Sequence, residues 1–193
     1  MNIANRLRKF SNTATVFSIA DIKKALDIRD QKSLYNAIYY SVRQKELYTI
    51  SEGVYSFDSD YSREEFANKY RTPSYISLYT VMQKSGVVFQ PYTSIFAITN
   101  RSESVDIDGQ TYVYRKIKDE ILLNPLGIEQ EDCVSSATVE RAICDKIYLD
   151  GVEYFDNLRN VNYELIERLN NEVYENNKEI SKFLQSLNNE SIK

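Results

Sequence analysis

Several polar residues between positions 32 and 43 fall on one face of a predicted helix. With about 100° of rotation per residue, this face lies opposite an apolar stripe. Arg and Asn side chains can form paired hydrogen bonds to guanine and adenine edges, while Lys and Tyr can reach phosphates. The pattern favours a DNA-contacting face over a merely solvated one, because Tyr39 and Tyr40 would be unusual in bare solvent. The candidate contacts on this helix are Lys32, Ser33, Asn36, Tyr39 and Arg43.

Basic residues also open the chain, and Arg6, Arg8 and Lys9 could neutralise backbone phosphates. Nine basic and five acidic side chains give residues 1–57 a charge of +4. The remainder has 15 basic and 23 acidic side chains, a charge of −8, which the overall value of −4 conceals. We therefore expect only the N-terminal part to meet a polyanion.

Residues for other kinds of chemistry are scarce. The chain has no histidine, which excludes Ser-His and Cys-His catalysis and His-ligated metals. Cys133 and Cys144 lack zinc or redox spacing and fit small core residues in a reducing cytoplasm. No glycine-rich phosphate loop is present. We expect no catalytic residue, metal site or cofactor.

One carboxylate-rich helix leaves an enzymatic alternative open. Glu140-Arg141 and Asp145-Lys146 combine acidic groups with a lysine, as a metal-dependent nuclease would, and Asp106 and Asp108 could join them. The favoured interpretation is an ordinary i,i+4 ion pair between Arg141 and Asp145, contributing about 0.2–0.5 kcal/mol.

The elements that would position the N-terminal face are three helices and a hairpin. Apolar residues recur at helical spacing, and Ser18 and Asp30 are predicted to cap the second and third helices, the third running to about Lys45. Two β-rich runs, residues 47–50 and 54–57, flank a three-residue loop that ends at Gly53. This order predicts a winged helix-turn-helix over residues 1–57; the alternative is a generic helical subdomain with a hairpin. The apolar helix positions are Ile3, Leu7, Phe10, Ile19, Ile22, Leu26, Leu34, Ile38 and Val42.

The rest of the chain predicts a polar linker with a short helix, residues 58–69, and a mixed α/β domain, residues 70–193. The fold class is therefore α+β, with a small antiparallel sheet and a C-terminal amphipathic helix. No apolar run is long enough to span a membrane and no secretion signal opens the chain, so we expect a cytoplasmic protein. The predicted strands are residues 87–89, 94–99, 104–107 and 110–117. Three helices are predicted. The first follows Pro73, is capped by Ser74 or Ser77 and is closed by Gly86; the second runs from Thr138 to Leu149, and the third covers residues 163–187.

Three blocks of sequence resemble one known family. They are residues 47–57 (LYTISEGVYSF), residues 73–78 (PSYISL) continuing to Gly86-Val87-Val88, and residues 136–149 (SATVERAICDKIYL). In this order they are similar to AbiEi-type antitoxins of type IV toxin–antitoxin, or abortive infection, systems. The wing differs in being poor in arginine and in carrying Glu52, and Thr138-Val139 replaces the more usual Ser-Pro.

The resemblance implies an N-terminal winged helix that binds operator DNA and represses its own operon. It also implies a second domain that neutralises a nucleotidyltransferase-type toxin, generally without tight binding to it. Two inverted repeats in the operator would supply useful specificity. Two alternatives remain: a protein-interaction module that uses the winged fold without DNA, and, third, a metal-dependent nuclease.

Overall fold

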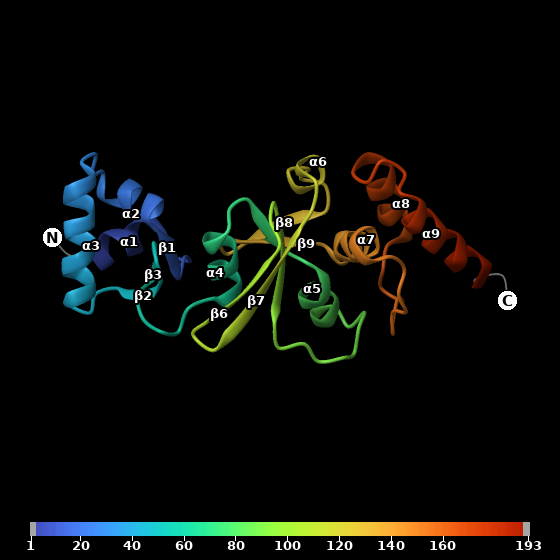
Figure 1. Cartoon of the computed structure of the whole chain (residues 1–193), viewed down its shortest axis with the longest axis horizontal. Helices are drawn as coiled ribbons and strands as arrows, with labels where there is room; N and C mark the ends of the chain where they lie inside the picture. The colour runs from blue at the N-terminus through green and yellow to red at the C-terminus, as the bar shows by residue number, and fades with distance from the viewer. Residues whose placement is uncertain (1–2, 191–193) are drawn as a thin grey trace.

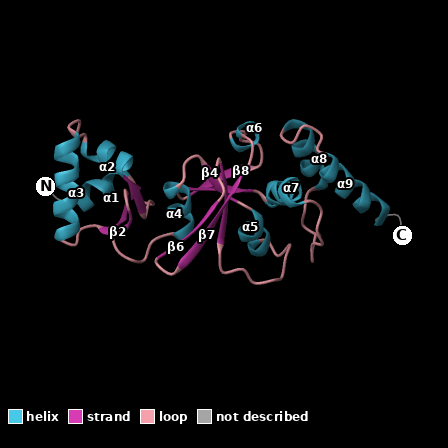
Figure 2. Ribbon diagram, viewed as in Figure 1, coloured by secondary structure: helices cyan, strands magenta, loops and turns pink. Residues whose placement is uncertain are grey.

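The computed structural model describes residues 3–190 and has an α+β fold. Figure 1 shows an elongated arrangement, with three N-terminal helices at one end, a six-stranded sheet in the middle and two C-terminal helices at the other end. Figure 2 shows the strands confined to two separate sheets. Within the described range, no helix is both long and apolar enough to cross a membrane.

The N-terminal region contains the three predicted helices and the predicted hairpin. A further strand, β1, completes an antiparallel sheet with the order β1-β3-β2. Ser51 pairs with Val54, so the turn is formed by Glu52 and Gly53 alone and is shorter than the predicted loop. Gly53 has φ +79°, a value that favours glycine. The elements are α1 (Ile3–Phe10), β1 (Val16–Ser18), α2 (Ile19–Leu26), α3 (Gln31–Arg43), β2 (Tyr48–Ser51) and β3 (Val54–Ser56).

The predicted caps of α2 and α3 are confirmed. Ser18 and Asp21 form a reciprocal capping box at the start of α2, and Asp30 accepts a hydrogen bond from the Ser33 amide at the start of α3. Helix α3 ends at Arg43 rather than near Lys45, because Lys45 has left-handed backbone geometry (φ +59°). Only residues 27–30 connect α2 to α3, so the connection between the two helices is a short turn.

The small sheet contributes to two cores because neighbouring residues of a strand point to opposite faces. Phe17 packs with Leu7, Ile22 and other residues of the three helices. Val16, Ile50 and Val54 belong instead to the larger core of the C-terminal region. The N-terminal region is therefore packed against the remainder of the chain.

Helix α4 (Arg63–Tyr70) is the short helix expected between residues 58 and 69. Its Phe66 and Ala67 are fully buried in the larger core. The Glu65 carboxylate accepts hydrogen bonds from both the amide and the hydroxyl of Thr15, at 2.8 and 2.7 Å. Lys69 reaches back to Asp21 at 2.8 Å. This segment thus connects the two regions through buried contacts as well as through the chain.

The larger sheet is mixed and has six strands, in the order β6-β7-β5-β4-β9-β8. The prediction of a small antiparallel sheet is wrong in size and in direction, since β5 runs parallel to β7 and β4 parallel to β9. The predicted strand over residues 87–89 is absent: Val87 and Val88 are buried within a loop. The strands are β4 (Ser74–Ile76), β5 (Ile95–Thr99), β6 (Glu103–Ile107), β7 (Gln110–Lys116), β8 (Ile128–Glu131) and β9 (Val134–Ala137).

Helices cover this sheet and extend beyond it. The helix expected after Pro73 begins only after Ser77, because residues 74–76 form a strand. The predicted amphipathic helix over residues 163–187 is two helices, because Glu175 and Asn176 take left-handed geometry between them. Figure 1 shows α7 between α5 on one side and α8 and α9 on the other. The helices are α5 (Leu78–Lys84), α6 (Asp119–Leu122), α7 (Val139–Asp150), α8 (Tyr163–Glu172) and α9 (Lys178–Glu190).

Candidate nucleic-acid interface

Helix α3 forms the outer edge of the N-terminal end of the molecule (Figure 1). Its Leu34 and Ile38 are buried at 2% and 3% exposure in the core of the three helices. The opposite face is open, and Lys32, Ser33, Asn36, Tyr39 and Arg43 are all exposed. The predicted division of this helix into an inner and an outer face is therefore confirmed, while DNA contact stays a prediction.

Tyrosines add apolar surface to this outer face. Tyr35, Tyr39 and Tyr40 are all exposed, and the rings of Tyr39 and Tyr40 meet edge to face with centroids 5.6 Å apart. Tyrosine hydroxyls can bond phosphates, while the rings can pack on sugars or on thymine methyl groups. At the start of the helix, hydrogen bonds from Ser33 lower the pKa of Asp30, so the capping carboxylate is ionised beside Lys32.

The three basic residues of α1 are not equivalent. Arg6 donates from Nη1 to the carbonyl of Leu26 at 2.9 Å, which satisfies the C-terminal end of α2. Arg8 stacks over the ring of Phe57, with 4.5 Å from its guanidinium carbon to the ring centroid. Lys9 is exposed and has no side-chain partner among the described residues. Arg6 and Arg8, two of the three residues predicted to contact phosphate, thus also contact other residues of the fold.

The β2–β3 hairpin carries no basic side chain, and Glu52 lies exposed at its turn. The turn is fixed to the start of α2, because the Ile19 amide donates to the Gly53 carbonyl at 3.2 Å. Burial raises the pKa of Tyr55, with smaller contributions from Tyr35 and Glu52. Electrostatic attraction to phosphate must therefore come from the helices rather than from the hairpin.

Helix α7 contains an ion pair whose burial the sequence analysis missed. Arg141 and Asp145 have 0% side-chain exposure, with 3.5 Å between Nε and Oδ1. Asp145 accepts hydrogen bonds from three hydroxyl groups, those of Tyr75, Ser77 and Tyr174. The expectation of an ordinary helix-surface pair is wrong. Ala142, Ile143, Cys144 and Ile147 leave α7 without a polar face, and this pattern is the signal that could have predicted burial.

The surroundings of Arg141 explain two local features. Its guanidinium donates to the carbonyls of Ile121 and Leu126, both at 2.7 Å. A side chain on Gly127 would place its Cβ 2.9 Å from the Cβ of Arg141, so glycine permits this loop to come close. Burial raises the pKa of Asp145, and the Arg141 charge and the three hydroxyl bonds oppose that shift.

The carboxylates considered for a nuclease do not come together. Asp106 bonds Thr111, and Asp108 accepts hydrogen bonds from Tyr48 and Tyr61 near the N-terminal region. Asp145 lies in α7, which Figure 1 shows away from the β6–β7 turn. Within residues 3–190, no group of three or more His, Cys, Asp or Glu side chains could hold a metal ion.

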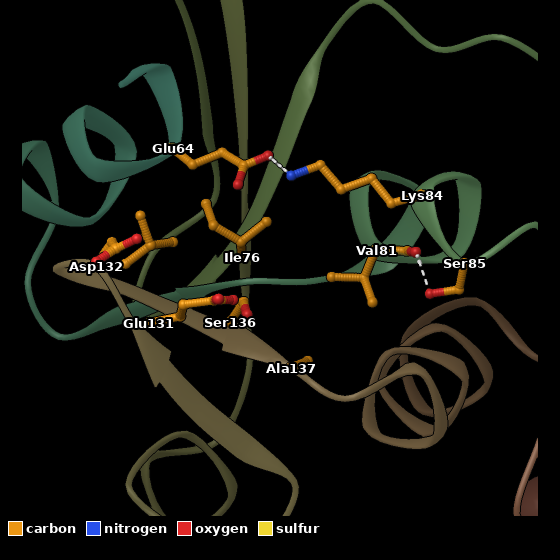
Figure 3. A pocket seen from close by; sticks show the side chains of 10 residues that line it. Glu64, Ile76, Val81, Lys84, Ser85, Glu131, Asp132, Ser136 and Ala137 are labelled. Atoms are coloured by element: carbon orange, nitrogen blue, oxygen red, sulfur yellow. Dashed lines mark hydrogen bonds and ion pairs between the residues drawn. The ribbon is translucent and has the colours of Figure 1, made fainter. Parts of the chain in front are cut away.

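A cavity of about 340 Å³ lies between α4, α5 and the turn that joins β8 to β9. Figure 3 shows the ion pair of Glu64 and Lys84 on one side. On the other side lie Glu131 at the end of β8, Asp132 in the turn and Ser136 in β9. The lysine that lines this cavity, Lys84, is paired with Glu64. Among the described residues, the cavity lining therefore has no unpaired cation that could bind an anionic ligand. Anion binding is better served by α3.

The outer face of α3 can combine charge, hydrogen bonding and stacking on one accessible helix. Lys32 and Arg43 lie near its two ends, and Asn36 and Tyr39 lie between them. An α-helix fits the major groove of B-DNA, where Asn and Arg distinguish bases. No protein-family model matches the chain, and no curated protein matches its sequence significantly.

Proposed function

We propose that residues 1–57 form a winged helix-turn-helix that binds DNA, with α3 as the recognition helix and the β2–β3 hairpin as the wing. Two features support this proposal. A four-residue turn joins α2 to α3, a connection typical of the helix-turn-helix. A three-stranded antiparallel sheet packs on the helices and contains the hairpin that follows α3.

The observation that carries the proposal is the outer face of α3. It lies at the end of the molecule, it is exposed along its length, and it contains the residue types that read base edges. The charge of the region supports this choice, since residues 1–57 carry +4 and the remainder carries −8. DNA would then meet the N-terminal end while the acidic remainder stays away from phosphate.

We propose further that the protein is a non-enzymatic, cytoplasmic antitoxin that represses its own type IV toxin–antitoxin operon. This part rests on the resemblance to AbiEi-type antitoxins. The operator would contain inverted repeats, and the functional partner would be a nucleotidyltransferase-type toxin, countered without tight direct binding. The C-terminal region would be needed for neutralisation, and its buried Arg141–Asp145 pair would hold that region in shape.

A binding experiment with the full chain tests DNA recognition. Fluorescence anisotropy should show tighter binding to the DNA upstream of its own gene than to shuffled DNA of equal length. Affinity for both should fall as salt rises, because phosphate contacts release counterions. Arg159→Ala and Lys116→Ala remove exposed charges outside the N-terminal region and should leave affinity unchanged. Equal affinity for both DNAs at every salt concentration would contradict operator recognition.

A cellular experiment tests the antitoxin part. Co-expression with the product of the neighbouring gene should restore growth if that product is a nucleotidyltransferase-type toxin, and a promoter reporter should be repressed. The exposed tyrosines of α3 favour one alternative, a protein-interaction module, since tyrosine is enriched in protein interfaces. Rescue of growth without any DNA binding would favour that alternative.

A further inference from the structure

Two loops of the C-terminal region lie side by side and expose aromatic rings. Residues 87–94 follow α5, and residues 151–157 follow α7 (Figure 1). The Phe89 amide donates to Asp156 Oδ2 at 2.7 Å, and the Asp156 amide donates to the Val87 carbonyl at 2.9 Å. Although hydrogen bonds hold the two loops together, the residues Phe89 and Tyr154 are 68% and 84% exposed. Two large aromatic rings are thus exposed to solvent on loops that hydrogen bonds hold together.

A cavity of about 310 Å³ opens between these rings and the helices behind them. Tyr79 and Tyr92 stack there with centroids 4.2 Å apart, and Glu153 and Asp156 also line the cavity. Rings and carboxylates together are the environment that binds organic cations, because aromatic faces carry partial negative charge. The chain already uses this chemistry, since Lys146 Nζ lies 5.4 Å from the centroid of Tyr79.

The charges around the cavity leave an excess of carboxylate. Lys146 lies 3.0 Å from Glu153 and 3.2 Å from Asp150, and Arg115 also pairs with Asp150 at 2.6 Å. Asp156 forms no ion pair within the described residues, and Glu153 Oε1 is buried without a hydrogen-bond partner there. Two cations therefore face three carboxylates, so one further cation would complete the balance.

We propose that this surface docks a partner protein by taking an arginine side chain of that partner into the cavity. The guanidinium would meet the Asp156 carboxylate on one side and the aromatic rings on the other, with the charge of Glu153 nearby. Phe89 and Tyr154 would pack against the residues beside that arginine. A protein is favoured over a small free cation because the exposed rings extend the apolar surface beyond the cavity, and aromatic–arginine contacts are typical of interface hot spots. Arginine is favoured over lysine because its planar, weakly hydrated group stacks on rings. The proposal does not depend on DNA binding.

A titration of the isotope-labelled full chain tests the proposal. The probe is the peptide acetyl-Leu-Arg-Leu-amide, and the matched control replaces arginine with citrulline, which has nearly the same shape but no charge. We expect saturable NMR shifts in residues 87–94 and 151–157, with the citrulline peptide binding about tenfold more weakly. Equal binding of the two peptides, or no saturable shift with either, would overturn the proposal.

Variants and a small cation complete the test. Phe89→Ala and Asp156→Asn should each weaken binding of the arginine peptide, and Asp156→Asn retains an oxygen that can accept from the Phe89 amide. Leu123→Ala removes an equally exposed apolar side chain elsewhere and should change nothing. If Phe89→Ala binds as the parent does, the assigned surface is wrong. If guanidinium chloride alone binds as tightly as the peptide, the site takes free cations and the docking proposal fails.

Discussion

Helices α3 and α7 have nearly the same length but treat charge in opposite ways. Helix α3 exposes Lys32 and Arg43 at the end of the molecule, and no acidic residue lies in its first turn. Helix α7 buries four charged residues, Glu140, Arg141, Asp145 and Lys146. On a helical wheel most polar residues of α3 share one face, whereas those of α7 are spread among apolar residues. Only the inner face of α3 is apolar, whereas α7 is packed on several sides.

This difference separates two uses of charged residues. A surface charge costs little to keep and can bind a ligand, whereas a buried charge must be paired and hydrogen-bonded to be tolerated. In α7, polar groups from distant segments bond the buried charges; the hydroxyls of Tyr75 and Tyr174, for example, donate hydrogen bonds to Asp145. We therefore expect changes in α7 to act on folding and changes in α3 to act on binding.

The largest effect is expected from Asp145→Ala. Removing this carboxylate leaves the buried Arg141 without its partner, which should lower the free energy of unfolding by about 3–5 kcal/mol. Urea unfolding of the full chain measures the loss. The control is Asp106→Ala, an aspartate on the exposed side of β6, which should cost far less. The double variant Arg141→Met, Asp145→Leu should recover part of the loss, and equal losses in Asp145→Ala and Asp106→Ala would contradict the comparison.

Substitutions on the outer face of α3 should weaken DNA binding and leave the stability of the fold nearly unchanged. Asn36→Ala and Arg43→Ala should each weaken binding to the operator by about 1–3 kcal/mol if they contact base edges. Lys32→Ala should weaken binding to operator and shuffled DNA about equally, because a phosphate contact carries no sequence information. Anisotropy titrations and thermal melts measure both properties. Melting temperatures near that of the parent are expected, and unchanged affinity in all three variants would exclude α3 as the recognition helix.

Helix α1 contains both kinds of charged residue, one that stabilises the fold and one whose exposed charge could bind DNA. Arg6→Ala should lower the free energy of unfolding by about 0.5–1.5 kcal/mol, because it removes the hydrogen bond to the Leu26 carbonyl. Lys9→Ala should leave unfolding unchanged and reduce the salt dependence of DNA binding by about one unit of slope. Chemical denaturation and salt titrations distinguish the two. A stability loss in Lys9→Ala equal to that in Arg6→Ala would show that the division between them is wrong.

The smallest effect concerns Glu65 and pH. Burial raises the pKa of Glu65, although hydrogen bonds from Thr15 oppose the shift. A raised pKa means that the folded protein binds the proton more tightly than the unfolded chain. The resulting stability is fully present below the ordinary glutamate pKa and is lost as pH rises through the raised value.

Glu65→Gln cannot titrate, so its stability relative to the parent should improve as pH rises from the ordinary glutamate pKa through the raised pKa of Glu65. Thermal melts of both proteins across this range measure the difference. A constant difference between them at every pH would show that Glu65 has the same pKa in the folded and unfolded states.

The sequence predicted the elements whose signals are local. The cap that Ser18 gives to α2 and the inner face of α3 each involve residues less than three turns apart. The same holds for the predicted strands that became β6 and β7, since only two residues separate Ile107 from its pairing partner Gln110. Such features are determined by neighbouring residues and need no knowledge of tertiary packing.

The features that the sequence analysis missed depend on distant partners. Strand β4 has three residues and β9 has four, and they pair through Ile76 and Ser136, sixty positions apart. Ser77 stands at the start of α5, but its hydroxyl bonds Asp145 instead of capping that helix. The candidate face of α3 could be predicted because exposure follows from helical periodicity. The altered roles of Arg6 and Arg8 could not, since each depends on a contact across the fold.

The two-faced sheet of the N-terminal region determines how this protein could be cut for engineering. A fragment that ends at residue 57 would place Val16, Ile50 and Val54 in water, because their packing partners lie in the larger core. It would also lose the Glu65 acceptor of Thr15 and the Lys69 partner of Asp21. A chimaera that transfers the N-terminal helices to another protein should therefore carry α4 as well. The graft would also need a new apolar cover for Phe66, which packs within the body left behind.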